Sequence, residues 1–362
     1  MKILYVTTVG ITMGFFKAFV RNLLDEGHTV DIATNEEGAP VPDCYREWGC
    51  AIHQIATSRS PLNKGNIKAI KQLKMLVAKE KYNVVHCHTP VAAICTRLAC
   101  RKARKNGTKV FYTAHGFHFY KGAPLKNWLM YYPVEKFCAY FTDVLITINK
   151  EDYALAKKKM KAKRVEYVPG VGIDLMKFGQ STVDESAKRK ELGVPKDATL
   201  LLSVGELNEN KNHETVIRAI ADLDVYYIIA GNGDLQEHLQ DIIDMLGMTE
   251  RVKLLGYRTD VAELYQIADY YVLPSIREGL NVSMMEAMAS GLPVICSRIR
   301  GNIDLIDNNG GNTFIAQRID DCQKAIKDVL CRNQEQLGKH NLLKSKDFEV
   351  GAVSAKMRRI YE

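Results

Sequence analysis

The chain has 362 residues, which is long for one compact domain and favours two. Its apolar content of 46% and charged content of 25% are ordinary for a soluble globular protein, and its net charge of +8 favours acidic partners such as phosphates, nucleic acid or anionic lipid. Nine scattered cysteines without a CxxC pair are typical of a reducing compartment. No apolar run reaches the length of a signal peptide or a membrane span, so we expect a cytosolic protein.

Short apolar or β-branched runs alternate with amphipathic segments through the first half of the chain. The strands predicted there are 2–8, 29–34, 51–56, 83–88, 109–114, 143–148 and 165–169. The segment 169–180, with one proline and three glycines, breaks the alternation and is predicted to be a linker. This order predicts an α/β domain with a parallel sheet and helices on both faces.

The alternation restarts after the linker. The strands predicted there are 199–205, 225–231, 251–256, 269–274 and 292–297, and the last residues of the chain are predicted to form a helix. The chain is therefore predicted to form two doubly wound α/β domains with a cleft between them. Ligands of such sheets bind at the carboxyl ends of the strands.

Three loops of the first half carry candidate site residues. Gly10 and Gly14 bracket a loop that leads into a helix, which favours either close approach to a phosphate or a simple tight turn. His115 directly follows a strand, so its imidazole is expected at the cleft, although a structural role is the alternative. His86 and His88 lie on one side of a strand, but a third ligand at suitable spacing is missing, so no metal site is expected.

Glycine-rich turns also end the strands of the second half. Gly205 ends a strand, and Lys211 precedes the next helix, where it could neutralise a diphosphate or simply be exposed. The next two strands are followed by Gly231, Asn232 and Gly233, and by Tyr257 and Arg258.

Two glutamates flank a predicted anion site in the stretch REGLNVSMMEAMASGLPVI. Glu278 lies in the loop after a strand, and the following helix is expected to start near Leu280, so that N–H groups from Gly279 onward face a phosphate. Glu286 stands eight positions after Glu278 among residues that look buried. A pyrophosphate on the helix N-terminus would then have a carboxylate on either side, one for a sugar and one for a ribose.

These motifs resemble those of retaining glycosyltransferases of family 4, which have the two-domain GT-B fold. The resemblance rests on the E-x7-E pattern with AMASGLPVI, on VGELNENKNH, on LGYRTDVAELY and on PGVGID. The segments AHGFHFYKGAPLKNWLMYYPVEKF and DVLITINKEDY resemble the bacterial capsule and exopolysaccharide members. Together these segments span nearly the whole chain.

The resemblance implies a role for each residue. Glu278 would contact the donor sugar, Glu286 the ribose, and His115 the transferred sugar or the acceptor. The remaining donor contacts would be Lys211, Gly279, Leu280 and Asn281 at the diphosphate, Gly14 at the phosphates, and Gly205, Gly231, Asn232, Gly233, Tyr257 and Arg258 around the first C-domain loop and the base. The implied domains are 1–170 for the acceptor, 171–345 for the nucleotide sugar and a C-terminal helix, 346–362, that packs back on the N-terminal domain.

The sequence departs from the family pattern in two loops. Glu206 stands where the family has an arginine beside the first glycine. Either Lys211 acts with another group, such as Arg277 or Arg300, or the donor is handled differently. Gly301 and Asp304 are the nearest equivalents of the family's Gly-Gly and Pro-Glu.

The expected reaction transfers a hexosyl or N-acetylhexosaminyl group from a nucleotide diphosphate sugar, by resemblance a UDP-sugar, to a hydroxyl with retention of configuration. No cofactor and no metal is expected, because helix N–H groups and Lys211 would carry the leaving-group charge. The one DxD sequence, Asp222 to Asp224, precedes a strand and is predicted to be a turn.

The expected acceptor is a lipid-linked saccharide. Basic segments in the first half predict contact with an anionic membrane from the cytoplasmic side, an ordinary solvated face being the alternative. The residues of these segments are Lys64, Lys68, Lys71 and Lys74, and Arg97, Arg101, Lys102, Arg104 and Lys105. Nucleic acid is the least favoured partner, because the chain has no recognised binding motif.

Two other functions stay open from the sequence. A nucleotide-sugar 2-epimerase with the same architecture would release a free isomerised donor without using an acceptor. A non-catalytic nucleotide-sugar-binding protein would bind a donor without turnover, and Glu206 is the best argument for it.

Overall fold

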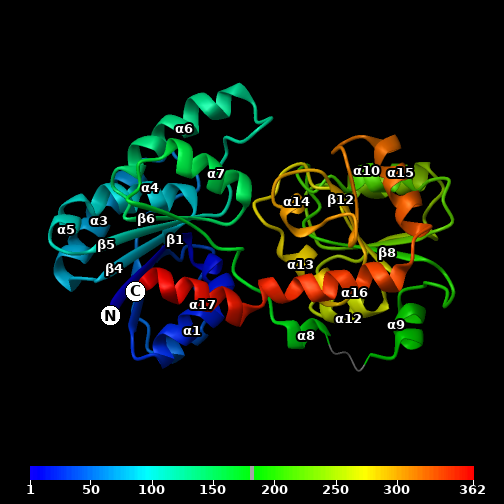
Figure 1. Ribbon diagram of the computed structural model, residues 1–362, viewed down its shortest axis with the longest axis horizontal. Helices are drawn as coiled ribbons and strands as arrows, with labels where there is room; N and C mark the ends of the chain where they lie inside the picture. Colours follow the sequence, from blue (N-terminus) through cyan, green and yellow to red (C-terminus); the bar gives the residue numbers. More distant parts are fainter. Residues whose placement is uncertain (180–182) are drawn as a thin grey trace. The chain divides into compact units, whose positions relative to one another are not determined.

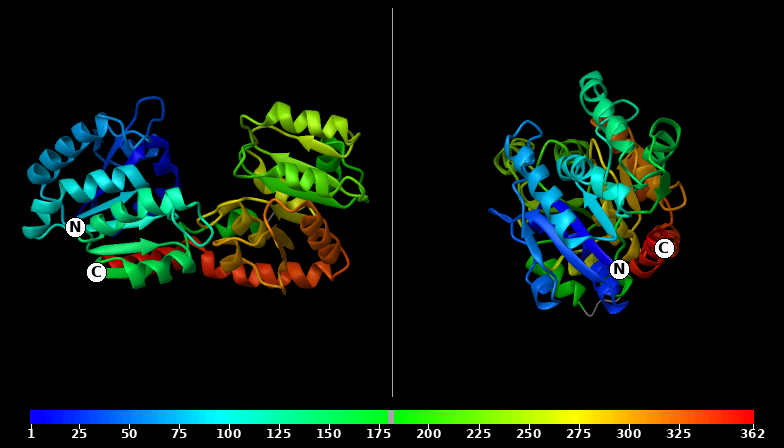
Figure 2. Two further views of the ribbon diagram at one scale, coloured as in Figure 1. Left: turned by 90° about the horizontal axis from the view of Figure 1, so that it is seen from above. Right: turned by 90° about the vertical axis from the view of Figure 1, so that its left-hand side faces the viewer.

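The computed structural model describes residues 1–179 and 183–362. The chain divides into two compact units, one formed by Met1–Val171 with Val353–Glu362 and the other by Gly172–Ala352. Helices cover both faces of the sheet in each unit (Figures 1 and 2). The predicted linker over 169–180 contains the division between Val171 and Gly172, and its last residue, Gln180, lies outside the described residues.

Unit 1 contains a seven-stranded parallel sheet in the order β3-β2-β1-β4-β5-β6-β7. Its strands are β1 (Lys2–Val9), β2 (Thr29–Asn35), β3 (Ile52–Gln54), β4 (Val84–His88), β5 (Lys109–Ala114), β6 (Val144–Thr147) and β7 (Arg164–Tyr167). Its helices are the 3-10 helix η1 (Gly10–Phe16), α1 (Lys17–Asp25), α2 (Cys44–Glu47), α3 (Gly65–Glu80), α4 (Pro90–Ala99), α5 (Arg101–Lys105), α6 (Leu125–Ala139) and α7 (Lys150–Lys159).

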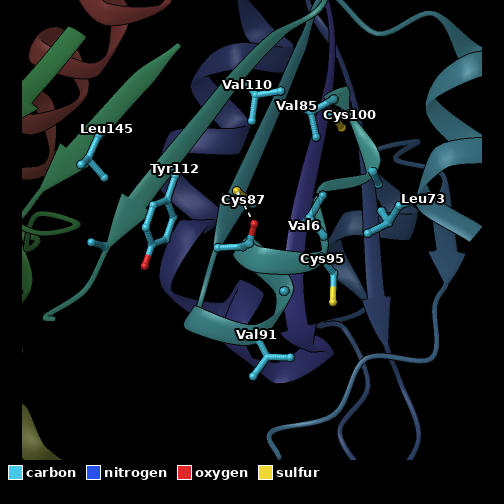
Figure 3. Close-up of a cluster of buried hydrophobic side chains, with 14 of the residues drawn as sticks. Val6, Leu73, Val85, Cys87, Val91, Cys95, Cys100, Val110, Tyr112 and Leu145 are labelled. Atoms are coloured by element: carbon cyan, nitrogen blue, oxygen red, sulfur yellow. Dashed lines mark hydrogen bonds between the residues drawn. The ribbon is translucent and has the colours of Figure 1, made fainter. Parts of the chain in front are cut away.

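Alternating side chains of the strands fill two hydrophobic clusters, one on each face of this sheet. On β1, Leu4 and Val6 belong to one cluster, whereas Ile3 and Tyr5 belong to the other. This two-residue period is the reason why the strands of a sheet that is covered on both faces are apolar throughout. Figure 3 shows the first cluster, where Val85, Cys87, Val110 and Tyr112 from β4 and β5 meet Leu73 of α3 and Val91 and Cys95 of α4.

Unit 2 contains a six-stranded parallel sheet in the order β10-β9-β8-β11-β12-β13. Its strands are β8 (Leu200–Val204), β9 (Tyr226–Ala230), β10 (Val252–Leu254), β11 (Tyr270–Leu273), β12 (Val294–Ser297) and β13 (Gly311–Phe314). Its helices are α8 (Leu175–Gly179), α9 (Glu185–Glu191), α10 (His213–Ala219), α11 (Gln236–Met245), α12 (Val261–Ile267), α13 (Val282–Ala289), α14 (Asn302–Leu305), α15 (Ile319–Leu330), α16 (Gln334–Ser345) and the 3-10 helix η2 (Lys346–Phe348).

Strand β13 was not predicted, because GNTF has neither the length nor the β-branched content of the other strands. The glycine at the start of this strand is required by a close contact with the neighbouring strand. A Cβ on Gly311 would lie 1.8 Å from the carbonyl oxygen of Val294 on the neighbouring β12, so only glycine fits there.

The last helix, α17, runs from Val350 to Tyr361. It is shorter than the predicted segment 346–362, because the 3-10 helix η2 comes before it. From Val353 onward it belongs to unit 1, where Val353, Met357, Ile360 and Tyr361 join the second hydrophobic cluster (Figure 1, in red). Within the described ranges, no helix combines the length and the apolar composition that a membrane span requires.

Candidate active site

The first two strand ends of unit 2 meet through glycines that bring backbone against backbone. A Cβ on Gly231 would lie 1.9 Å from the carbonyl oxygen of Gly205, and a Cβ on Gly233 would lie 2.3 Å from that of Leu207. The N–H of Leu207 donates to the carbonyl of Asn232 at 2.9 Å. The loops after β8 and β9 therefore form one packed edge that tolerates no side chain at Gly231 or Gly233.

The loop after β11 leads into α13, which begins at Val282. The predicted start near Leu280 was wrong, because Asn281 is the N-cap: its Oδ1 accepts from the N–H of Met284 at 2.8 Å. The hydroxyl of Ser283 also donates to Asn281 Oδ1, at 2.8 Å. Since the first N–H groups of a helix have no acceptor within it, the groups of α13 not used by this cap are available to an anion.

Lys211 and Glu278, 67 positions apart in the sequence, form an ion pair beside the loops after β8 and β11. The Nζ of Lys211 lies 2.7 Å from Oε1 of Glu278, and both side chains are less than one-fifth exposed, at 17% and 13%. The loops are also joined by their backbones, since the N–H of Ile276 donates to the carbonyl of Asn210 at 2.8 Å. The structure thus brings together a cation and a carboxylate that the sequence had placed in separate motifs.

Glu286 lies on α13, is half-buried, and contacts Tyr265 of α12. The hydroxyl of Tyr265 lies 3.0 Å from Oε2 of Glu286 and donates to it and to the carbonyl of Ser283. Burial raises the pKa of the Glu286 carboxyl, while the Tyr265 hydrogen bond and the charge of Lys177 act in the opposite direction. The sequence did not predict the role of Tyr265, because only the fold brings α12 against this face of α13.

Tyr257 and Arg258 follow β10 but differ in their surroundings. Tyr257 is exposed, whereas the Arg258 guanidinium binds Asp260 at 2.5 Å and Glu191 at 3.1 Å. Lys188 also binds Asp260, at 2.5 Å, so these groups form one ion network. An Arg258 engaged in this way is held by protein carboxylates, which leaves Tyr257 as the more available of the two for a base.

The loop after β12 packs on the loop that precedes α13. A Cβ on Gly301, which has a φ of +80°, would lie 2.4 Å from the carbonyl oxygen of Gly279. Of the two arginines considered as replacements at position 206, Arg277 is exposed and Arg300 is buried. Glu206 itself is exposed and accepts from the side chain of Asn208 at 2.8 Å. Arg277 is therefore the better placed of the two to meet a soluble anion.

Three histidines stand together in unit 1 at the ends of β4 and β5. The Nδ1 of His88 lies 3.2 Å from Nε2 of His115. His86 is bonded through Nδ1 to the hydroxyl of Tyr361 on α17, at 2.6 Å, and through Nε2 to Thr113, at 2.8 Å. Burial lowers the pKa of His86 to about 3 and that of His115 to about 4, and it lowers the pKa of His88 as well. All three imidazoles are therefore neutral at pH 7.

The metal hypothesis for His86 and His88 gains no support from these contacts, since both rings are engaged with protein side chains. In the ranges that the structure describes, no three His, Cys, Asp or Glu side chains gather as a metal site would require. Metal independence stays a prediction.

Gly14 lies in η1, exposed, and a Cβ built on it would meet nothing within 4 Å. This open position leaves room for a ligand near its backbone, and a role of Gly14 at the phosphates stays a prediction.

Unit 1 also has an open pocket of 620 Å³ near the carboxyl ends of β1, β4 and β5. Its lining includes the polar residues Thr8, Thr12 and Thr89 and the apolar residues Ile94, Phe119 and Met130. The segment after β5 lines this pocket through residues 116–119, and α6 lines it through residues 130, 131, 134 and 135.

Arg97, which was predicted to belong to a basic surface segment, is buried. Arg97 is only 1% exposed, and its Nη1 lies 2.8 Å from Oε2 of the buried Glu135. Its guanidinium also lies 4.2 Å from the ring centre of Tyr112. It cannot contact a membrane, because this charge sits in the interior of unit 1. In contrast, Lys64, Lys68, Lys71 and Lys74 on or beside α3 are exposed.

Two family models match the chain. One, described as glycosyl transferases group 1, matches residues 184–341, and the other, described as glycosyl transferase 4-like, matches residues 2–149. The putative glycosyltransferase EpsD of Bacillus subtilis is 38% identical over 99% of this chain and 96% of its own length. An Escherichia coli UDP-Gal:α-D-GlcNAc-diphosphoundecaprenol α-1,3-galactosyltransferase is 32% identical over 67% of this chain and 66% of its own.

Solved structures share the architecture. A crystal structure of HepE from Anabaena in complex with UDP superposes with a TM-score of 0.83 over 99% of both chains at 18% identity. WaaG, a glycosyltransferase involved in lipopolysaccharide biosynthesis, superposes with a TM-score of 0.75 over 99% of both chains, also at 18% identity. The predicted GT-B fold, with two Rossmann-like units, is confirmed. The chain belongs to glycosyltransferase family 4, and it is a glycosyltransferase.

Proposed function

We propose that this glycosyltransferase moves a hexosyl or N-acetylhexosaminyl group from a UDP-sugar to a hydroxyl of a lipid-linked saccharide, with retention of anomeric configuration. The observation that carries the proposal is the grouping in unit 2 of the Lys211–Glu278 pair, the N-terminus of α13 and the half-buried Glu286. This grouping offers cationic and N–H donors to a diphosphate and carboxylates to hydroxyls.

The diphosphate would bind at the N-terminus of α13. Lys211 and the free N–H groups there supply positive potential, and Arg277 is exposed beside the loop. Lys211 would be shared between Glu278 and the phosphate oxygens, so the ion pair keeps the amine oriented before the donor arrives. This is preorganisation: the charge that meets the leaving group is already in position.

Glu278 and Glu286 would bind opposite ends of the donor. Glu278, which is partly accessible beside Lys211, would accept a hydrogen bond from a hydroxyl of the sugar. Glu286, held by Tyr265, would accept from the ribose hydroxyls. A carboxylate that is already partly desolvated forms a stronger hydrogen bond to a diol than one in open water does.

The transfer step would occur on one face of the sugar. The bond from the anomeric carbon to the diphosphate oxygen breaks, and a bond to the acceptor oxygen forms on the same face. The acceptor proton passes to the departing diphosphate oxygen, so the products are UDP and the glycoside. Lys211 and the N–H groups of α13 would stabilise the charge on the diphosphate as it departs.

The acceptor would bind on unit 1. The 620 Å³ pocket is lined both by threonines near the ends of β1 and β4 and by apolar side chains, which suits a molecule with a sugar and a lipid part. The E. coli relative, by its name, acts on a saccharide carried by diphosphoundecaprenol, and this supports the same acceptor class. His115, neutral at pH 7, would contact the transferred sugar or the acceptor as a hydrogen-bonding group rather than as a cation.

The epimerase and the non-catalytic hypotheses make different predictions. An epimerase would convert the donor into a free isomerised sugar nucleotide, and a binding protein would leave the donor unchanged with any acceptor. Neither is favoured, since both named relatives are glycosyltransferases.

The test is a donor and product screen. Purified protein is incubated with UDP-, GDP- and ADP-sugars in EDTA, with and without short-chain diphospholipid-linked saccharides, and the products are followed by nuclear magnetic resonance. We expect UDP release and an α-linked product from an α-linked UDP-sugar, both lost in Glu286→Ala. A β-linked product would refute retention, and activity only with added divalent metal would refute metal independence.

A further inference from the structure

Helix α6 places one carboxylate in the lining of the 620 Å³ pocket of unit 1. Glu135 belongs to this lining together with Tyr131 of the same helix and Tyr112 of β5. It is the only acid among the described residues that line the pocket. Its side chain is 9% exposed, so the carboxylate is mostly withdrawn from water. A carboxylate buried to this extent is nearly always paired with another group.

Arg97 of α4 is the partner of this carboxylate, and it is held on three sides. Its Nη1 donates to Oε2 of Glu135 at 2.8 Å, and its Nε donates to the carbonyl of Ala93, one helical turn earlier, at 3.0 Å. Its guanidinium also lies 4.2 Å from the ring centre of Tyr112. Arg97 itself is not among the described residues that line the pocket. It therefore fixes Glu135 from the interior of unit 1.

The second oxygen of Glu135 has a weaker protein contact. The hydroxyl of Tyr112, whose side chain is drawn in Figure 3, lies 3.4 Å from Oε1, which is long for a hydrogen bond between two oxygens. An ionised carboxylate offers about four lone-pair sites. The described contacts with Arg97 and Tyr112 use two of them. Glu135 therefore keeps the capacity to accept hydrogen bonds from a molecule in the pocket.

Stability alone does not explain a charged pair at this place. Desolvation of two buried charges offsets much of their attraction, and apolar side chains of similar volume are often as stabilising as a buried ion pair or more so. Helices α4 and α6 are also joined by apolar side chains, since Ala92 of α4 and Ala139 of α6 belong to one hydrophobic cluster. A ligand that binds the carboxylate in the pocket accounts for the charge.

We propose that Glu135 recognises the acceptor saccharide by accepting a hydrogen bond from one of its hydroxyl groups. Arg97 is a positioning residue, because it holds the carboxylate in place and neutralises its charge. The inference rests on the proposed function and deepens it, since it assigns the residue that selects the sugar of the acceptor.

The charge balance of the pair identifies the group that binds. Because Arg97 already neutralises Glu135, a hydroxyl can donate to the carboxylate without leaving any buried charge unpaired. A phosphate would meet a carboxylate of the same sign, and an ammonium group would compete with Arg97. In a pocket withdrawn from water, the hydrogen bond from a hydroxyl to a carboxylate is also stronger than at the surface. The site therefore fits a neutral sugar rather than the diphosphate of the acceptor.

Acceptor binding by an apolar double variant tests the proposal. Arg97→Met with Glu135→Leu removes both charges together, so no charge is left buried without a partner and the fold is expected to be kept. The acceptor probes are short-chain diphosphate lipids that carry GlcNAc, GalNAc, glucose or galactose, titrated by calorimetry without a donor. We expect the double variant to bind the best of these probes at least about tenfold more weakly than the wild type does, with unchanged UDP affinity.

A conservative variant separates recognition from packing. Arg97→Met with Glu135→Gln keeps a carbonyl oxygen that can accept from a hydroxyl, again without a buried charge. This variant should bind the same probe at least about threefold more tightly than the leucine variant does. A pair that only joins α4 to α6 gives no reason for such a difference between two folded variants.

A second ion pair of unit 1 provides the matched control. The Nε of Arg104 lies 2.8 Å from Oδ2 of Asp143, the two side chains are 14% and 11% exposed, and neither residue is among the described lining of the pocket. In Arg104→Met with Asp143→Asn, the asparagine can still accept from the N–H of Val110, which Asp143 does at 2.8 Å. This variant may change the melting temperature but should bind the acceptor probe as the wild type does.

Monodeoxy forms of the best probe test the contact without any change in the protein. Loss of one particular hydroxyl should weaken binding to the wild type at least about tenfold, and the same loss should matter little in the leucine variant. Equal wild-type affinity for all monodeoxy forms would overturn the proposal even if the leucine variant did not fold. A folded leucine variant with wild-type acceptor affinity would also overturn it, as would a wild type that binds none of the probes.

UDP-sugar turnover, measured in the same preparations, separates this proposal from the proposed function. Turnover by the wild type, together with wild-type acceptor affinity in the leucine variant, would contradict only the role of Glu135. Acceptor binding that depends on Glu135, without turnover of any nucleotide sugar, would contradict the proposed function and leave the recognition site standing.

Discussion

The ion pair of Lys211 and Glu278 gives a quantitative prediction about coupling in the candidate donor site. With 2.7 Å between Nζ and Oε1, the direct Coulomb attraction is about 6 kcal/mol at an effective dielectric constant of about 20. Because both side chains are mostly removed from water, desolvation offsets much of this attraction, and we expect a net coupling of about 1–2 kcal/mol. This exceeds the value of about 0.2–1 kcal/mol that is common for exposed pairs.

A double-mutant cycle measures this coupling. Lys211→Met, Glu278→Gln and the double variant are unfolded in urea, and the three changes in free energy of unfolding are compared with the wild type. Each single variant should be destabilised more than the exposed control Lys74→Met, because each leaves a partly buried charge without its partner. Single changes that add up to the double change within about 0.3 kcal/mol would refute the coupling.

Three further predictions follow from individual positions. Because burial raises the pKa of Glu286, its carboxyl lowers the free energy of unfolding as pH rises above the pKa of the unfolded state. Glu286→Gln should therefore raise the free energy of unfolding at pH 7. An equally large increase at pH 4, measured by urea titration, would contradict this. Burial lowers the pKa of His115 to about 4, so the contribution of the neutral imidazole to the free energy of unfolding is complete above about pH 6.5 and is lost as pH falls toward 4. The difference in free energy of unfolding between the wild type and His115→Gln should therefore shrink over that range. A constant difference would refute the assignment. Gly231→Ala should lower the free energy of unfolding by at least about 2 kcal/mol, since the new Cβ would meet the Gly205 carbonyl at 1.9 Å. Gly14→Ala should change the melting temperature little and instead weaken donor binding. Equal melting temperatures for both variants would show that the loop after β9 relaxes.

Much of the fold was predictable because each strand is short, apolar and followed by a helix. Strand β1 was predicted at 2–8 and runs from Lys2 to Val9, and β11 was predicted at 269–274 and runs from Tyr270 to Leu273. The predictions failed where a long-range contact decides the residue type. The first residue of β13 has to be glycine, because a side chain on Gly311 would collide with the carbonyl of Val294, which lies 17 positions earlier in the sequence.

The candidate site was predictable as a set of strand-end residues, but its contacts were not. The sequence placed Lys211 and Glu278 in separate motifs, and their 2.7 Å contact depends on β8 and β11 being neighbours in the sheet. It placed Arg97 in a basic surface segment, although Glu135 on another helix holds this arginine in the interior.

The most direct test of the central claim is calorimetric titration of UDP, in EDTA, into the wild type, Lys211→Met and Glu286→Ala. The account predicts that the wild type binds UDP without metal and that each variant binds at least about tenfold more weakly, because Lys211 meets the diphosphate and Glu286 the ribose. Titration of Leu343→Asp, changed at an exposed position on α16 of unit 2, should match the wild type. Equal UDP affinity in all four proteins would contradict the assignment of this site.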